Sequence, residues 1–304
     1  HDVILRHERT RKDKDDDRTR HIVDLRAPTG PGFLVHPTAP AIDATVARAT
    51  AEPALFEFWA KDGIGHTLWR VSSDVRDALI GAFAAVPRLY IADGHHRAAS
   101  ALRARRALAG PGGEHGAPPV EANGFLAVAF PDDQTRILPY HRYVTDLHGH
   151  SPETFLAALG TRVEVHAEPG QPGSAGPASA LPDRPGEVAM YLAGRWYALR
   201  LPPAASRVAP ADGLDVALLQ DQVLGPILGI GDPRTDQRIG FMGGIRGAAA
   251  LAALVDDGQA RVAFVLRPVT IGDLMRIADA GGIMPPKSTW FEPKLRDGLL
   301  THLV

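Results

Sequence analysis

The amino-acid sequence predicts an α+β protein. Two segments, 54–71 and 187–201, have aromatic and β-branched arms around a turn, the pattern of a β-hairpin. Between and after them, apolar residues recur with the period of an amphipathic helix. Because hairpins are mixed with helices, the pattern favours an α+β fold over a doubly wound parallel sheet.

The first hundred residues predict a charged helix, a hairpin, a helix, a strand and a further helix. Residues 9–26 carry both charge signs densely, which is typical of a solvated helix face. The hairpin at 54–71 is followed by a helix over 73–85, with Ser73 as the expected N-cap. A strand over 89–92 then leads into a helix that opens around residue 96 and ends near residue 110.

The middle of the chain predicts one buried strand and a second hairpin. Residues 124–130 are wholly apolar, which predicts a buried strand. The turn residues at 131–133 then predict that 135–144 pairs back on this strand. The Pro- and Gly-rich segments 110–119 and 168–187 predict exposed loops.

The second half continues with the hairpin at 187–201 and with helices over 214–228 and 246–256. The sequence "RVAFVLRP" predicts a strand, and Thr270 with Asp273 predicts a capping box at the start of a last helix. We therefore expect two domains, 1–147 and 148–304, and the change of character after Leu147 marks the boundary.

Composition narrows the classes of function. The net charge of −2 gives no support for a nucleic-acid footprint, and no apolar run approaches the ~20 residues of a membrane span. The chain has no cysteine, so thiol chemistry is excluded and the cytoplasm is the default compartment. The oligomeric state is left open, with a homodimer as one candidate. Since the chain opens abruptly at His1, we expect residues upstream in the natural protein.

The main candidate site is "YIADGHHRAAS", where a strand becomes a helix. The first turn of a helix has unpaired N–H groups and partial positive charge, which suits phosphate or carboxylate. Gly94 allows a tight turn, and the planar fork of Arg97 fits a phosphate. Asp93 is placed to hold a metal ion, accept a proton or orient His95 or His96. The structural alternative is that Asp93 only caps the helix and the histidines pack against it.

Three weaker clusters carry further candidates. "HERTR" offers a base and two arginines, "DPRTDQRIGFMGG" resembles an anion-binding loop, and "PPKSTWF" sets a lysine beside two hydroxyls. Each pattern is also typical of a charged or salt-bridged loop, and none is a P-loop. The candidates from these clusters are Glu8, Arg11, Arg234, Arg238, Lys287, Ser288 and Thr289.

Five blocks together resemble a bacterial family named for domain of unknown function 1015. They are "RHERTRKDKDDDRTRH", "YIADGHHRAASAL", "FPDDQTRILPYHR", "DPRTDQRIGFMGG" and "MPPKSTWFEPKL", they occur in the family's order, and they span nearly the whole chain. The family's upstream Pro-Pro-Tyr-Asp segment is absent, and Ala98 stands where the family commonly has tyrosine.

The block around Asp93 also resembles the phosphate-binding motif of the ParB/sulfiredoxin fold, which free-serine kinases share. This resemblance implies a ParB/sulfiredoxin-like first domain with ATP or ADP and Mg²⁺ as cofactors. Asp93, His95, His96 and Arg97 would then surround the phosphates and the Mg²⁺ ion, which Asp93 would hold, and Glu8 would be the base. Residues of the second domain, Lys287 and Ser288, would close the site.

The function expected on this basis is phosphoryl transfer from a nucleotide to serine or a similar small alcohol. Two alternatives stay open: a nucleotide or phosphoester hydrolase, and a nucleotide-binding switch without enzymatic activity. The kinase, the hydrolase and the switch each need a single site formed by several of the charged clusters. We therefore expect four segments to converge on one cleft: 7–8, 93–97, 232–238 and 287–289.

Overall fold

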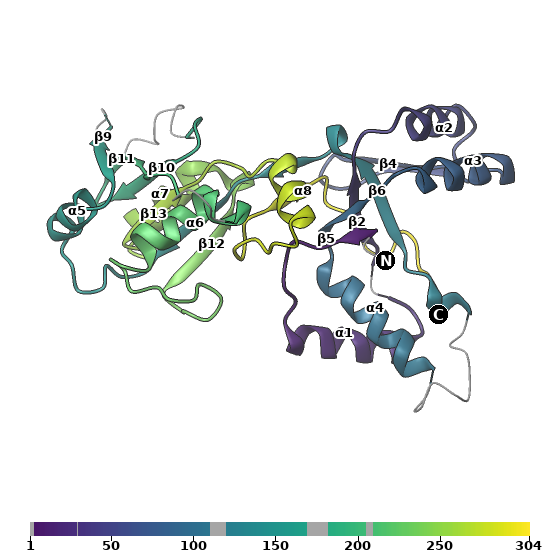
Figure 1. Cartoon of the computed structure of the whole chain (residues 1–304), viewed down its shortest axis with the longest axis horizontal. Helices are drawn as coiled ribbons and strands as arrows, with labels where there is room; N and C mark the ends of the chain where they lie inside the picture. The colour runs from purple at the N-terminus through teal and green to yellow at the C-terminus, as the bar shows by residue number, and fades with distance from the viewer. Residues whose placement is uncertain (1–2, 29, 110–119, 169–181, 205–208) are drawn as a thin grey trace.

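The computed structural model describes residues 3–28, 30–109, 120–168, 182–204 and 209–304. These residues form two lobes that lie side by side along the long axis of the molecule (Figure 1). The loops expected at 110–119 and over most of 168–187 fall outside the described residues.

The first lobe is built on a small mixed sheet. Its order is β1-β5-β2-β6, with β5 antiparallel to β2 and the two other pairings parallel. Strand β5 buries alternate residues, Tyr90 and Ala92, as the two-residue period of a strand requires. The strands are β1 (Ile4–Leu5), β2 (Gly32–His36), β5 (Leu89–Asp93) and β6 (Ala127–Pro131).

Four helices and a hairpin complete this lobe. Helices α1 and α4 pack against each other below the sheet in Figure 1, while α2 and α3 lie together at the far upper end. The predicted hairpin is present as an antiparallel pair. The elements are α1 (Lys12–Leu25), α2 (Pro40–Thr50), α3 (Ser73–Ala84), α4 (His95–Leu108), β3 (Phe56–Trp59) and β4 (Gly65–Leu68).

The second lobe contains a six-stranded antiparallel sheet of order β12-β8-β13-β10-β11-β9. The hairpin predicted at 187–201 is its β10–β11 pair. The strands are β8 (Tyr140–Val144), β9 (Glu164–Ala167), β10 (Glu187–Leu192), β11 (Arg195–Arg200), β12 (Ile239–Gly243) and β13 (Val262–Val265).

Helices cover both faces of this sheet. On β10, Met190 and Leu192 join the main core beneath α5, α6 and α8, whereas Ala189 and Tyr191 join a smaller core beneath α7. This alternation explains why the strand is buried from Val188 to Leu192, since both of its faces are covered. The helices are α5 (Pro152–Gly160), α6 (Asp215–Leu219), α7 (Gly247–Asp256) and α8 (Ile271–Asp279).

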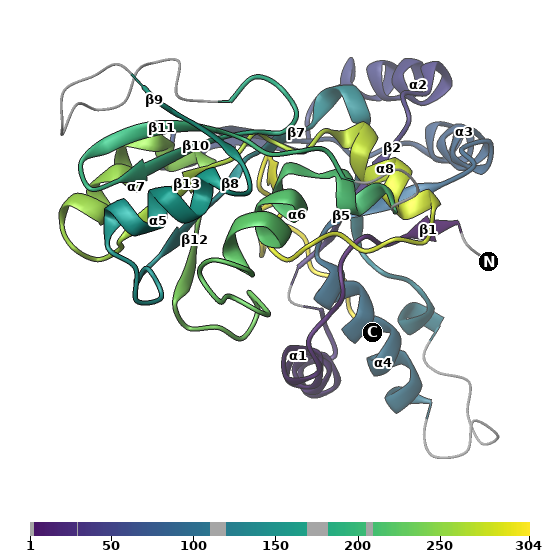
Figure 2. The same ribbon diagram turned by 60° about the vertical axis from the view of Figure 1, so that its left-hand side comes forward.

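A two-stranded ribbon of β7 (Arg136–Leu138) and β14 (Trp290–Glu292) lies where the lobes meet, near the middle of Figure 2. The ring centroids of Phe33 and Phe291 are 5.5 Å apart, and Phe33, Tyr90 and Phe291 belong to the same core as the second sheet. The two lobes therefore share one continuous apolar core.

The middle of the chain corrects two expectations. Strand β6 is half-exposed rather than buried, because it lies at an edge of its sheet. It does not pair with the following segment: β7 pairs with β14, and β8 enters the second sheet. The change of sheet thus comes before Tyr140, and the domain division after Leu147 stays a prediction.

The C-terminal residues make contacts with the first lobe. Backbone N–H of Val304 donates to the carbonyl of Arg26 at 2.8 Å, and Arg296 pairs with Asp62. The end of the chain therefore packs back on the first lobe.

Several helices begin or continue differently from the predicted pattern. Helix α3 has Ser72, not Ser73, at its N-cap, and the segment expected as one helix over 214–228 is α6 followed by the π-helix η4 (Gln220–Leu224). The capping box of Thr270 and Asp273 is present. None of the described helices is long and apolar enough to cross a membrane. Short 3₁₀ helices are η1 (Val120–Asn123), η2 (Asp132–Gln134), η3 (Pro210–Gly213) and η5 (Gly244–Arg246).

Candidate functional site

The site begins where β5 ends. Gly94 follows the strand with φ 89°, a left-handed conformation, and α4 starts at His95. The left-handed backbone favours glycine here, and a Cβ atom would lie 3.0 Å from Arg97 Nε, so the arginine side chain would have to shift slightly. No side chain caps the first turn of α4, so its N–H groups are left for another partner.

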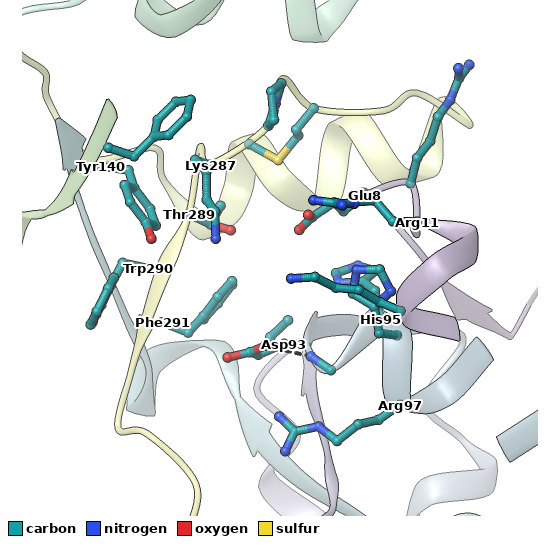
Figure 3. Close-up of a pocket in the computed structure, with 18 of the residues that line it drawn as sticks. Glu8, Arg11, Asp93, His95, Arg97, Tyr140, Lys287, Thr289, Trp290 and Phe291 are labelled. Carbon is teal, nitrogen blue, oxygen red and sulfur yellow. Dashed lines mark hydrogen bonds between the residues drawn. The ribbon is translucent and has the colours of Figure 1, made fainter. Parts of the chain in front are cut away.

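A cavity of about 580 Å³ opens at this helix end, between the two lobes. One side comes from the segment after β1 and from the β5–α4 junction, and the other from 284–297 and the second sheet. In Figure 3, Lys287 and Thr289 point toward Glu8 across the cavity, with Tyr140, Trp290 and Phe291 as an aromatic wall.

The cavity is strongly positive although the whole chain carries a net charge of −2. Eight lining residues are basic and three are acidic. Such a concentration of one sign in a concave surface attracts anions. The basic residues are Arg9, Arg11, Lys14, Arg18, Arg97, Arg234, Lys287 and Lys294, and the acidic ones are Glu8, Asp93 and Asp297.

Asp93 is held by two donors. The backbone N–H of Gly94 donates to Asp93 Oδ1 at 2.7 Å, and Lys294 Nζ donates to Oδ2 at 3.2 Å. Burial acts to raise the pKa of Asp93, but Lys294, the Gly94 N–H and Arg97 together lower it below the ordinary value. Asp93 is therefore ionised at neutral pH.

His96 links helix α4 to helix α1 through Asp15. Its Nδ1 lies 2.8 Å from Asp15 Oδ1, and the hydroxyl of Ser100 donates to the backbone carbonyl of Asp15 at 3.2 Å. The hydroxyl of Thr10 also donates to the Asp15 carboxylate, at 2.7 Å. The imidazole of His96 still lines the cavity, so it joins the site to the helix pair.

Glu8 is half-buried and lies beside two buried histidines, His7 and His95. Burial raises the pKa of Glu8, with Lys287 and His96 opposing the rise and Asp93 adding to it. Burial lowers the pKa of His7 to about 3 and that of His95 to about 4. Both imidazoles are therefore neutral at pH 7.

The loop that carries Lys287 is fixed by a buried arginine. The Arg142 guanidinium donates to the carbonyls of Tyr140 at 2.6 Å, Pro286 at 3.0 Å and Lys287 at 3.2 Å. Lys287 itself has φ 55°, which is uncommon for a residue with a side chain and typical of a constrained functional loop. Its Nζ lies 5.4 Å from the centre of the Tyr140 ring.

The structure brings most of the expected residues to this cavity. Arg97 and Lys287 both line it, as do the predicted residues Glu8, Arg11, Asp93, Gly94, His95, His96, Arg234 and Thr289. Their roles stay predictions.

Two expected residues point elsewhere. The Arg238 guanidinium is bound by Asp236 and by the carbonyls of Leu228 and Gly229, so it braces its own loop. Ser288 is buried, and its hydroxyl donates to the carbonyl of Pro285 at 2.6 Å.

The sequence reasoning missed several lining residues. Lys294 and Asp297 lie just beyond the "PPKST" loop, and Lys14 and Arg18 recur at a helical spacing of four on α1. The spacing was visible in the sequence, but only the packing of α1 on α4 turns these side chains toward the cavity.

Comparison with curated proteins gave no match. Solved structures gave several, among them a free serine kinase mutant in complex with ADP, with TM-score 0.45, 11% identity and coverage of 95% of this chain and 84% of that one. A conserved hypothetical protein from Pyrococcus furiosus has TM-score 0.41, 13% identity and coverage of 97% and 90%. SbnI with a C-terminal truncation, from Staphylococcus aureus, has TM-score 0.46, 12% identity and coverage of 99% and 85%.

At these TM-scores the likenesses carry no functional conclusion, and the ParB/sulfiredoxin assignment stays a prediction. The family model gives a firmer result, because it matches residues 1–217, well over half of the chain. The resemblance found in the motif blocks is thereby confirmed: the chain belongs to the family described as Protein of unknown function (DUF1015).

Proposed function

We propose that the cavity binds ATP or ADP and that the protein transfers the terminal phosphoryl group to the hydroxyl of a small acceptor such as free serine. The observation that supports this most is the concentration of basic side chains at an uncapped helix N-terminus, with a half-buried carboxylate, Glu8, beside that helix end on the same wall of the cavity.

The phosphate end of the ligand would lie at the β5–α4 junction. N–H groups of the first turn of α4 would donate to phosphate oxygens, and Gly94 has no side chain to block their approach. Arg97, Lys294 and Lys287, which line the cavity, would supply positive charge. Asp93 is the ionised carboxylate that would hold Mg²⁺ beside the phosphates, the arrangement that Mg²⁺ commonly adopts, and the ion would neutralise developing charge.

The acceptor would lie on the Glu8 side of the cavity. The Glu8 carboxylate would take the proton of the acceptor hydroxyl while that oxygen forms a bond to the terminal phosphorus and the bond to the bridging oxygen breaks. ATP would then leave as ADP, and ADP as AMP. A raised pKa improves Glu8 as a base, because a carboxylate with a higher pKa holds a proton more strongly.

Binding is tested first, by calorimetry with ATP, ADP and AMP in the presence of Mg²⁺. Arg97→Ala removes one charge-assisted contact worth ~1.5–3 kcal/mol, so binding should weaken roughly 10- to 150-fold. Arg106→Ala is the matched control, since Arg106 is exposed on the same helix and does not line the cavity. Absence of nucleotide binding to the wild-type protein would overturn the proposal.

Transfer is tested with a panel of free amino acids and small alcohols, with phosphorylated acceptor and free phosphate measured in parallel. Glu8→Gln should lower turnover by ~10²–10⁴ and leave nucleotide binding intact. Glu57→Gln, at an exposed position on β3, is the control. Release of phosphate without phosphorylated acceptor would replace the kinase with a hydrolase, and binding without turnover would leave a switch module.

A further inference from the structure

We propose that His7, Glu8 and His95 form a binding site for one divalent transition-metal ion of the zinc class. This site differs from the Mg²⁺ position at Asp93 in its ligands and its chemistry. It does not rest on nucleotide binding, because it follows from the geometry of these three side chains alone.

The three residues offer one ligand atom each, and these atoms all lie within 4.8 Å of one another. The two imidazole rings meet edge to face with their centroids 4.5 Å apart. Ligand atoms of a tetrahedral zinc centre are roughly 3.3 Å apart, given bonds of ~2.0–2.1 Å. Small side-chain rotations would therefore bring the three atoms to bonding distance.

Both histidines are buried, and the backbone of Ile91 is a hydrogen-bonding neighbour of His7. His7 is 1% exposed and His95 is 7% exposed. Neither ring nitrogen of His7, nor Nε2 of His95, makes a hydrogen bond of normal geometry among the described residues. Buried polar atoms are nearly always satisfied in native proteins, so unpartnered nitrogens of two adjacent rings point to a missing ligand between them. One cation beside Glu8 would bind one nitrogen of each ring, and the Ile91 backbone is a neighbour for the second nitrogen of His7.

The fold already holds these residues in place. The carbonyl of His7 accepts from the N–H of Met284 at 2.8 Å, which fixes the segment after β1. His95 is the first residue of α4, directly after the constrained Gly94. The ligands thus come from two rigid positions rather than from a loose surface loop, as a specific metal site requires.

The ligand types select the ion. Imidazole nitrogen favours Zn²⁺, Co²⁺ and Fe²⁺, whereas Mg²⁺ and Ca²⁺ prefer oxygen. Two imidazoles and one carboxylate leave at least one coordination position open, and Glu8 and His95 both line the cavity, so this position faces ligands there. Because a bound cation lowers the pKa of a carboxylate, Glu8 would act as the base of the proposed function only while this site is empty.

The test uses the untagged, metal-free full chain without nucleotide. Zn²⁺ is titrated in competition with a chromophoric chelator, and Co²⁺ is added separately because its visible absorption reports low-coordinate nitrogen and oxygen ligation. We expect one equivalent of Zn²⁺ per chain, together with a rise in melting temperature. A tenfold excess of Mg²⁺ should not displace the Zn²⁺.

Two variants and one control locate the ion. His95→Phe and His7→Phe should each weaken Zn²⁺ binding at least roughly tenfold, since even residues that only support a ligand cost that much. Both should fold without metal, as judged by circular dichroism, because phenylalanine fills the space without a buried unpaired nitrogen. His21→Gln removes an exposed histidine of α1 and should bind Zn²⁺ normally.

Absence of saturable Zn²⁺ and Co²⁺ binding would overturn the site, and so would equal binding by wild type and His95→Phe. A loss of binding in His21→Gln as large as that in His95→Phe would identify adventitious surface binding and also overturn it. Because nucleotide is absent throughout, a chain that binds Zn²⁺ but not ATP would retain this inference and refute the proposed function.

Discussion

Lys294→Met separates a role in ligand binding from a role in folding. Lys294 Nζ lies 3.2 Å from Asp93 Oδ2 and 4.8 Å from the centre of the Trp290 ring. The Lys294 and Asp93 side chains are 42% and 44% exposed, so solvent screens the ion pair to about 0–1 kcal/mol. An exposed cation–π contact adds ~0.5–1 kcal/mol. We therefore expect the free energy of unfolding to fall by at most about 2 kcal/mol.

Nucleotide binding should suffer much more than folding. If Lys294 contacts a phosphate, its removal costs ~1.5–3 kcal/mol of binding free energy, a loss of roughly 10- to 150-fold in affinity. Lys12→Met is the control, because Lys12 makes a similar ion pair, 2.9 Å from Asp16, and does not line the cavity. Urea unfolding and calorimetry with ATP and Mg²⁺ measure the two effects separately. A Lys294→Met protein that binds ATP as tightly as wild type would refute the placement of the phosphates.

The remaining predictions concern stability. Gly94→Ala should destabilise the fold by ~1–2 kcal/mol, because alanine is strained at φ 89° and its Cβ atom would contact Arg97. Gly81→Ala, in the open middle of α3, should stabilise the fold by ~0.5–1 kcal/mol. Urea unfolding measures both, and equal changes in stability for the two variants would contradict this reasoning. Burial, with a smaller contribution from Arg142, lowers the pKa of His141 from 6.5 to about 4. The neutral His141 therefore contributes its full stabilisation above pH 6.5. This stabilisation is lost at about 1.4 kcal/mol per pH unit as the pH falls toward 4. His141→Asn keeps an acceptor for the Leu266 N–H but does not titrate, so its unfolding free energy should fall less on acidification; parallel pH profiles for the two proteins would contradict this.

Local sequence patterns determined the elements whose physics is local. The hairpin of β10 and β11 follows from alternating residues around a turn, and the start of α8 follows from a Thr270 hydroxyl and an Asp273 carboxylate three residues apart. The strand-to-helix junction at Gly94 was predicted for the same reason, since a left-handed turn needs glycine. These features depend on neighbours within a few residues.

Pairing between distant segments was not predictable from those patterns. The chain does turn at 131–133, yet β6 and β8 belong to different sheets. The apolar pattern of a strand predicts that the strand is buried, but it does not specify which strand it pairs with. Likewise, Arg234 and Arg238 are four residues apart in one charged motif. The Arg238 guanidinium hydrogen-bonds within its own loop, whereas Arg234 lines the cavity.

By itself, then, the sequence determined a fold that mixes helices and sheets, the strand-to-helix junction at Gly94 and the family. Only the tertiary structure decided that the C-terminal segment returns to the first lobe, which brings Lys294 to Asp93, and that the segment after β1 sets His7 against His95. The physical reason is that a residue type sets its own chemistry and its local backbone preference. Which distant side chains become its neighbours depends on how the whole chain buries its shared apolar core.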